Sequence, residues 1–304
     1  MLVRVRLILL AGALACLATA CTATPATAPA ANTKPAAAAT AATALPRGAT
    51  PSPSPKPKPK PPAPSVGIYR VRTSDGAVVT VAVFRGPVRY RLHNGSEDPG
   101  YAAAVAGVKA GSAVGGAERK HLLAVFNGGF KLGVGAGGYE QEGHVISPLL
   151  KGYASLIIDR SGRARIGVWG YGAPGPGEAV YSVRQNLQPL VQHGKPTQAA
   201  YDWYAWGATL GGGELVARSA LGQDPAGDLL YAGSMSASPA DLAQALTRHG
   251  ARIAMELDIN PEWVQLDVAS RPGGSLRADV PGQYRPANQF IDGWSRDFIT
   301  VLAG

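Results

Sequence analysis

The sequence SPADLAQALTRHGARIAMELDINP, residues 238–261, predicts a helix, a glycine stop and a strand that ends in acidic residues. Ser238 is a preferred N-cap, Pro239 suits the first helical turn, and Asp241 completes a capping-box pattern. Apolar residues recur at helical spacing and give the helix one apolar face. Gly250 can adopt the left-handed conformation that ends many helices. We therefore expect an amphipathic helix followed directly by a strand.

This strand carries two carboxylates on one face. Glu256 and Asp258 alternate with Met255 and Leu257, and residues two positions apart on a strand are separated by roughly 7 Å. Two carboxylates at about this separation are typical of enzymes that cleave glycosidic bonds, and a nearby like charge raises the pKa of one of them. Glu256 and Asp258 are therefore the predicted catalytic residues. The alternative is that they lie on the solvent side of an edge strand.

Residues 1–21 resemble a lipoprotein signal segment. Arg4 and Arg6 precede an apolar run that is short for a membrane span, and small residues precede Cys21. The chain contains only Cys16 and Cys21, so no disulfide can form within the part that follows. We predict lipidation of Cys21, which would make the membrane a partner and the location extracytoplasmic and lipid-anchored. The alternatives are cleavage without lipid, giving a secreted protein, or a retained anchor.

Residues 22–64 are predicted to be a disordered tether, because their Ala, Thr, Pro and Lys composition cannot bury a core. Of the 29 basic residues 7 precede residue 65, whereas none of the 20 acidic residues does. Residues 65–304 therefore carry a net charge of only +2 out of the +9 of the whole chain. A protein that binds nucleic acid needs a basic face on its folded part, so no nucleic-acid partner is predicted.

Residues 65–304 have the length of a single domain and contain one short strand after another. Turn sequences at 74–76, 160–163 and 224–227 predict hairpins. We also expect residues 88–92 to extend the first hairpin and residues 296–302 to return to the sheet. With one well-defined helix, the pattern predicts an α+β fold with a mixed, mostly antiparallel sheet and few helices.

Substrate-binding candidates follow the apolar strand predicted at residues 122–126. Glycines allow close approach of the backbone, and an asparagine amide both donates and accepts hydrogen bonds. We therefore predict that Asn127, Gly128 and Gly129 bind substrate, the alternative being an ordinary tight turn.

The glycine-rich segment 133–143 is predicted to be a mobile loop over the site. The acidic residues and the histidine in and beside it, Glu140, Glu142 and His144, match no metal-binding spacing. No metal or other cofactor is therefore indicated, although a divalent metal remains compatible with the sequence.

The chain carries six short motifs, which are N-G-G-F at 127–130, R-Q-N-L at 184–187, L-V-Q-H-G at 190–194, R-S-A-L-G at 218–222, M-E-L-D-I-N-P at 255–261 and S-R-D-F at 295–298. Together and in this order, they resemble the phosphodiester glycosidase domain family over most of residues 66–304. The combination of R-Q-N-L, M-E-L-D-I-N-P and S-R-D-F resembles an actinobacterial branch of that family. One departure is that Ile259, Asn260 and Pro261 stand where the family has glycines.

The resemblance implies an extracytoplasmic hydrolase that cleaves a sugar-1-phosphodiester bond in cell-wall or exported polysaccharide, so a carbohydrate or sugar phosphate would be its substrate. Asp258 takes the position of the family's aspartate, and Arg218 would hold the phosphodiester through a bidentate fork. The alternative role of Arg218 is an ion pair with a carboxylate in the sheet.

The alternative function is a catalytically inactive protein that binds glycan or assists polysaccharide export. Two acids exposed on an edge strand would favour that alternative. A cleft that brings together Asn127, Arg218, Glu256 and Asp258 would favour the hydrolase.

Overall fold

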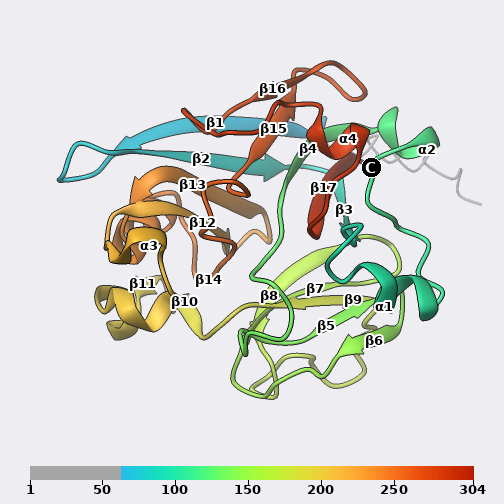
Figure 1. The fold of residues 1–304 in the computed structure, drawn as a ribbon, viewed down its shortest axis with the longest axis horizontal. Helices are drawn as coiled ribbons and strands as arrows, with labels where there is room; N and C mark the ends of the chain where they lie inside the picture. Colours follow the sequence, from blue (N-terminus) through green and yellow to red (C-terminus); the bar gives the residue numbers. More distant parts are fainter. Residues whose placement is uncertain (1–62) are drawn as a thin grey trace, which may run out of the picture. The chain divides into compact units, whose positions relative to one another are not determined.

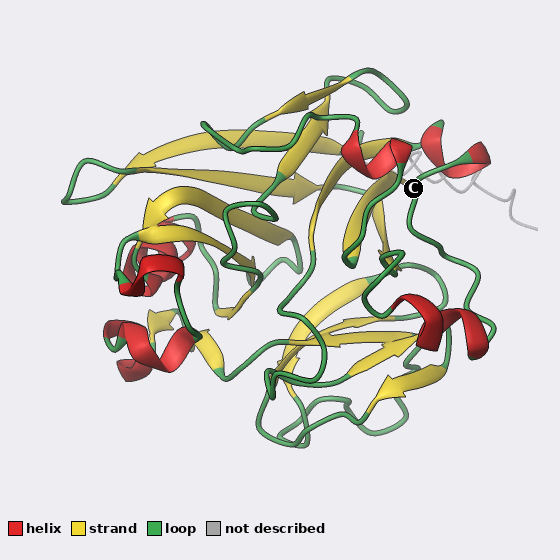
Figure 2. Ribbon diagram, viewed as in Figure 1, coloured by secondary structure: helices red, strands yellow, loops and turns green. Residues whose placement is uncertain are grey.

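The computed structural model describes residues 63–304, and its helices and strands are shown in Figures 1 and 2. The predicted signal segment, Cys21 and all but the end of the predicted tether lie outside the described residues. No helix among the described residues combines the length and the hydropathy that a membrane span requires.

The described chain forms three sheets with few helices, and every pair of neighbouring strands in them is antiparallel. The α+β prediction is confirmed, with three sheets in place of one. The first sheet has seven strands. In spatial order they are β1 (Ser65–Arg72), β2 (Val78–Arg85), β13 (Leu229–Ala237), β12 (Val216–Gln223), β14 (Ile253–Glu256), β10 (Pro189–Gln192) and β11 (Lys195–Pro196).

The second sheet corrects the expectation for residues 88–92. These residues belong to β3, which leaves the first hairpin and pairs with β17 in a separate five-stranded sheet. The return of the C-terminal strand is confirmed, because β17 lies between β3 and β4. The spatial order is β16 (Leu276–Ala278), β15 (Leu266–Ala269), β4 (Leu122–Asn127), β17 (Phe298–Ala303) and β3 (Val88–His93).

The third sheet also has five strands and contains the hairpin predicted around residues 160–163, formed by β7 and β8. The hairpins predicted at 74–76 and 224–227 join β1 to β2 and β12 to β13 in the first sheet. The third sheet is ordered β6 (His144–Ser147), β5 (Tyr139–Gln141), β9 (Ser182–Gln185), β7 (Ala154–Ile158) and β8 (Ala164–Val168).

The predicted helix is α3, and both halves of its capping box are present. The Ser238 hydroxyl accepts a hydrogen bond from the Asp241 N–H at 3.2 Å, and the Asp241 carboxylate accepts one from the Ser238 N–H at 2.9 Å. Gly250 has φ +97°, as a helix stop requires. The helices are α1 (Gly100–Val105), α2 (Gly116–Arg119), α3 (Pro239–Arg248), α4 (Gln289–Asp292) and the 3₁₀ helices η1 (Gln198–Tyr201), η2 (Trp203–Trp206) and η3 (Leu210–Gly212).

Two large apolar cores lie on opposite faces of the first sheet. The central core combines side chains from all three sheets, for example Phe84, Phe126 and Leu156. The other core lies between the first sheet and α3, where Leu242 and Leu246 are fully buried. Figure 1 shows α3 beside β12 and β13. The first sheet is therefore covered on both faces, and its inner strands are shielded from solvent.

Strand β14 is one of these inner strands, because it pairs with β12 on one side and β10 on the other. Glu256 and Asp258 are both buried, with exposed fractions of 0% and 4%. The alternative that these acids lie on the solvent side of an edge strand is therefore wrong.

Candidate active site

The two acids predicted to work side by side have separate partners. Glu256 follows the alternation of β14 and lies on the α3 side with Ala254, where its Oε1 is 2.9 Å from Nη1 of Arg218. Both side chains are completely buried. Burial raises the pKa of the Glu256 carboxyl, and the Arg218 charge opposes this rise. The structure thus shows the ion pair that was the alternative role of Arg218.

The Asp258 backbone is fixed beyond the end of β14. Its N–H donates to the Gly128 carbonyl at 3.0 Å, and its carbonyl accepts from the Ser219 hydroxyl at 2.7 Å. The carboxylate accepts a hydrogen bond from the Asn260 N–H at 2.9 Å and lies 3.5 Å from the guanidinium of Arg296. Because the strand ends at Glu256, Asp258 leaves the core and reaches a different arginine.

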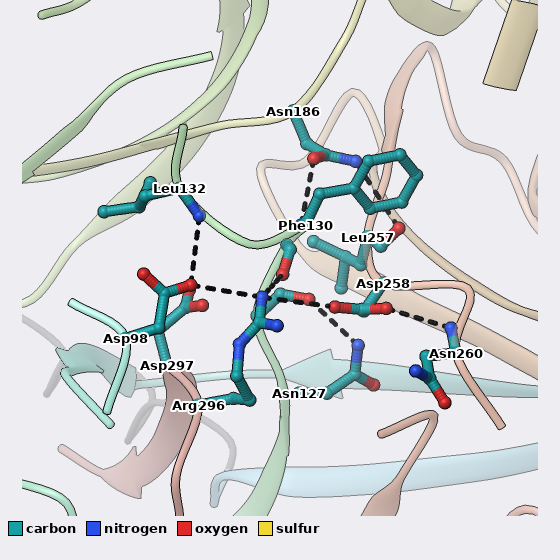
Figure 3. Close-up of polar contacts among 12 residues, drawn as sticks. Asp98, Asn127, Phe130, Leu132, Asn186, Leu257, Asp258, Asn260, Arg296 and Asp297 are labelled. Carbon is teal, nitrogen blue, oxygen red and sulfur yellow. Dashed lines mark hydrogen bonds and ion pairs between the residues drawn. The ribbon is translucent and has the colours of Figure 1, made fainter. Parts of the chain in front are cut away.

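Arg296 lies between two carboxylates (Figure 3). Its Nη2 is 3.3 Å from Asp98 Oδ2 and 3.5 Å from Asp258 Oδ2, and it donates to the Gly129 carbonyl at 3.3 Å. Its guanidinium lies 4.3 Å from the centre of the Trp263 ring. Arg296 is 5% exposed, and within residues 63–304 its Nε and Nη1 have no hydrogen-bond partner. Arg296 is thus held among Asp98, Asp258 and the Gly129 carbonyl through Nη2 alone.

A second buried pair explains the two glycines after β4. Arg184 binds Asp297 through two hydrogen bonds of 2.7 and 3.2 Å. A Cβ on Gly128 would lie 2.0 Å from Asp297 Oδ2, and one on Gly129 would lie 2.9 Å from Arg184 Cζ. The glycines are thus required by this ion pair, and the Gly128 N–H already donates to the Asp297 carbonyl.

Asn127 is also occupied inside the protein. Its amide nitrogen donates to the Gly128 carbonyl and the Ser219 hydroxyl, both at 2.9 Å. Its amide oxygen accepts from the Tyr231 hydroxyl at 3.0 Å and from the Gln265 N–H at 3.1 Å. All of its side-chain hydrogen-bonding positions are used, so in this structure Asn127 holds the turn and has no free group for substrate.

Asn186 connects this turn to the end of β14. Its amide oxygen accepts from the Phe130 N–H at 3.1 Å, and its nitrogen donates to the Leu257 carbonyl at 3.4 Å (Figure 3). The same nitrogen donates to the Glu256 carbonyl at 3.0 Å. The positions of Asp258 and of the N-G-G-F turn are therefore coupled through one buried side chain.

Asp258 lines a cavity of about 380 Å³. This size lies within the usual range for small-molecule sites. Asp258 is the only acidic residue in its lining, and neither Glu256 nor Arg218 reaches it. The lining comprises Phe130, Lys131, Val134, Gly135, Ala136, Leu187, Gly207, Ala208, Leu210, Asp258, Ile259, Asn260 and Trp263.

Part of the predicted loop does lie at this cavity, because Val134, Gly135 and Ala136 line it. Residues 139–141, in contrast, form the regular strand β5. Within residues 63–304 no group of three or more His, Cys, Asp and Glu side chains is arranged to hold a metal ion.

The pKa of the Asp258 carboxyl is raised toward neutrality. Burial raises its pKa to about 6, against the lowering effects of the Arg296 charge and the Asn260 N–H. A carboxyl group with such a pKa is about nine-tenths carboxylate at pH 7 and is a stronger base than an ordinary aspartate, which favours proton transfer.

The sequence-based candidates missed the arginine and aspartate residues around Asp258. Arg184 and Asn186 lie in R-Q-N-L, and Arg296 and Asp297 lie in S-R-D-F, two motifs that carried the family resemblance without a predicted role. Asp98 lies outside these motifs. A charged residue in an otherwise apolar run, as in S-R-D-F-I-T-V, is the signal that could have identified the second pair.

Comparisons with known proteins find only distant structural similarity. No protein-family model and no curated protein matches the sequence. Among solved structures, the chain is similar to the catalytic domain of zebrafish N-acetylglucosamine-1-phosphodiester α-N-acetylglucosaminidase, auto-inhibited by its pro-peptide. The TM-score is 0.49 and the identity 12%, over 79% of this chain and 83% of the zebrafish chain.

A hypothetical protein from Synechocystis is also similar, with a TM-score of 0.47 and 13% identity over 80% of this chain and 62% of that chain. Similarity at this level indicates a distant structural relationship and assigns no residue a role.

Proposed function

We propose that this protein is a hydrolase that cleaves a sugar-1-phosphodiester bond, with Asp258 as the reacting carboxylate. The observation that carries the proposal is that Asp258 is nearly buried, lines the cavity and has a pKa raised to about 6. Buried carboxyls with shifted pKa values in a cavity are frequent catalytic groups.

The chemistry of the bond assigns the role of Asp258. The leaving group is the anion of a phosphate monoester, which is stable without a proton, so the demanding step is attack at the anomeric carbon. Asp258 as a carboxylate takes a proton from water as the water oxygen bonds to that carbon. The carbon–oxygen bond to phosphate breaks, and its electron pair leaves with the phosphate.

The neighbouring charges support this role. Arg296 orients the Asp258 carboxylate, and Asp98 holds Arg296 from its other side. Lys131 lines the same cavity and offers a positive charge to the phosphodiester. Asp98 and Arg296 are thus positioning residues, whereas Asp258 and Lys131 face the ligand.

The family resemblance supports the same proposal. N-G-G-F, R-Q-N-L, the L-D of M-E-L-D-I-N-P and S-R-D-F are distant in sequence, yet residues of all four are joined by hydrogen bonds and ion pairs around Asp258. We further propose that the protein is extracytoplasmic, anchored through a lipid on Cys21, and acts on cell-wall or exported polysaccharide.

The test is sugar release from a panel of sugar-1-phosphodiesters by the purified chain and by two variants. We expect turnover that Asp258→Asn abolishes and Glu256→Gln retains in folded protein. Turnover that is indifferent to Asp258→Asn would refute the assignment of the reacting group. Glycan binding with no turnover on any diester would favour the catalytically inactive alternative. Mass spectrometry of the membrane-extracted protein and of Cys21→Ser tests the anchor.

A further inference from the structure

The cavity beside Asp258 has a mostly apolar lining with a few polar side chains. Its polar side chains are Asp258, Asn260 and Lys131, and the other side chains that line it are apolar. The apolar side chains come from four separate segments. They are Phe130, Val134, Ala136, Leu187, Ala208, Leu210, Ile259 and Trp263.

Two of these apolar side chains lie in the open. Val134 is 61% exposed and Leu210 is 68% exposed, and they belong to segments far apart in the sequence. A single exposed apolar side chain is ordinary on a protein surface. We call these two side chains the apolar edge of the cavity, because exposed apolar side chains in a cavity lining are typical of a ligand contact.

The apolar edge continues inward as close packing. A Cβ on Gly207 would lie 2.6 Å from the Phe130 ring and 3.3 Å from Ile259, so the backbone, the ring and the isoleucine are in tight contact. Ile259 is one of the residues that stand where the family resemblance calls for glycine. The replacement makes this side of the cavity more apolar than a glycine turn would be.

We propose that the group esterified to the sugar phosphate is a long-chain alcohol, so that the substrate is a sugar-1-phosphate diester with an alkyl or prenyl chain. This inference rests on the proposed function for the sugar end of the ligand, and on the apolar edge for the chain. Lys131 neutralises the phosphate that joins the sugar to the long-chain alcohol. A cavity of about 380 Å³ holds a head group, and the chain leaves across Val134 and Leu210.

The first test measures binding and needs no turnover. Isothermal titration of the purified chain compares octyl phosphate, below its micelle concentration, with methyl phosphate. Each methylene group that binding removes from water raises the affinity by a factor of about four. If several methylene groups of the octyl chain contact the protein, octyl phosphate should bind at least about tenfold more tightly than methyl phosphate. Lys131→Gln should weaken both ligands alike, because both carry the phosphate.

Matched variants separate the apolar edge from general adsorption. Val134→Asn and Leu210→Asn should each lower the affinity for octyl phosphate about fivefold to tenfold and leave methyl phosphate little changed, because they remove apolar contact without adding charge. Val145→Asn is the control, since Val145 is 60% exposed on β6 and does not line the cavity. Equal affinities of the protein for the two phosphates, or an equal loss of affinity in Val145→Asn, would overturn the inference.

Hydrolysis then separates this inference from the proposed function. The substrates are a sugar-1-phosphate octyl diester and the matching methyl diester. If the protein binds octyl phosphate more tightly than methyl phosphate but hydrolyses neither diester, the proposed function is refuted and the apolar subsite is kept. Hydrolysis of both at equal efficiency, with equal binding, would keep the proposed function and refute the long-chain substrate.

Discussion

Glu256 and Asp258 are two positions apart, both are buried, and each lies beside an arginine, yet their surroundings differ. Glu256 and Arg218 lie in the core beneath α3 and do not line the cavity. Asp258 and Arg296 lie past the end of the same strand, where Asp258 lines the cavity. Burial and ion pairing therefore do not by themselves identify a catalytic carboxylate. The alternation stops at the end of the strand, and this places the two carboxylates in different surroundings.

The sharpest test of this difference is the loss of one carboxylate at a time. Asp258→Asn should lower kcat by about 10³-fold, because the proposed base is removed while the shape is kept. Steady-state sugar release measures the effect, with Asp75→Asn in an exposed turn as the matched control. A loss of less than tenfold would place the reacting group elsewhere.

The complementary change acts on stability. Glu256→Leu leaves the Arg218 charge buried without a partner and should lower the free energy of unfolding by about 3–5 kcal/mol. The double variant Glu256→Leu/Arg218→Met removes both charges and should recover most of this loss. Urea unfolding measures both variants. A double variant as unstable as the single one would show that packing, and not the unpaired charge, is responsible.

A third change tests the ion pair behind the N-G-G-F turn. Gly128→Ala places a methyl group against Asp297 and should lower the free energy of unfolding by about 1–3 kcal/mol. Gly111→Ala is the control, because a Cβ there meets nothing within 4 Å. If the two variants unfold at the same urea concentration, the turn adapts more easily than its close contacts indicate.

The smallest expected effect is the change in kcat/KM with each unit of pH. Because the pKa of Asp258 is raised to about 6 and its carboxylate is the proposed active form, kcat/KM should be half-maximal near pH 6 and level above about pH 7. Below pH 6 it should fall about tenfold for each pH unit, as the base becomes protonated. A rate that increases as the pH falls through 6 would make Asp258 the acid instead of the base.

The local features of the fold could be predicted from the sequence. The capping box of α3 and the turns at 74–76, 160–163 and 224–227 depend on residues within a few positions of each other. The pairing of β3 with β17 could not be predicted this way, since about 200 positions separate them and no turn sets their register.

The candidate site also combines local features that the sequence predicts with long-range contacts that it does not. Asp258 was predicted as a site residue from the alternating pattern of residues 253–258, and the same pattern predicted Glu256 beside it, whereas the structure gives the two acids separate arginines. Arg296 and Asp98 approach Asp258 only through tertiary packing, so no spacing in the sequence indicates them. The glycines after β4 were recognised as close-approach positions, but the structure brings Asp297 and Arg184 to them.

The position of β17 between β3 and β4 has a consequence for biosynthesis. A ribosome that has completed Asn127 must add roughly 170 further residues before Phe298 can pair with it, which takes roughly 10–35 s at ordinary rates of translation. Until then β3 and β4 have no strand between them, and neither Asp297 nor Arg296 exists to complete the ionic network. The ion pairs of Arg296 with Asp98 and Asp258, and that of Arg184 with Asp297, can therefore form only after nearly the whole chain has been synthesised.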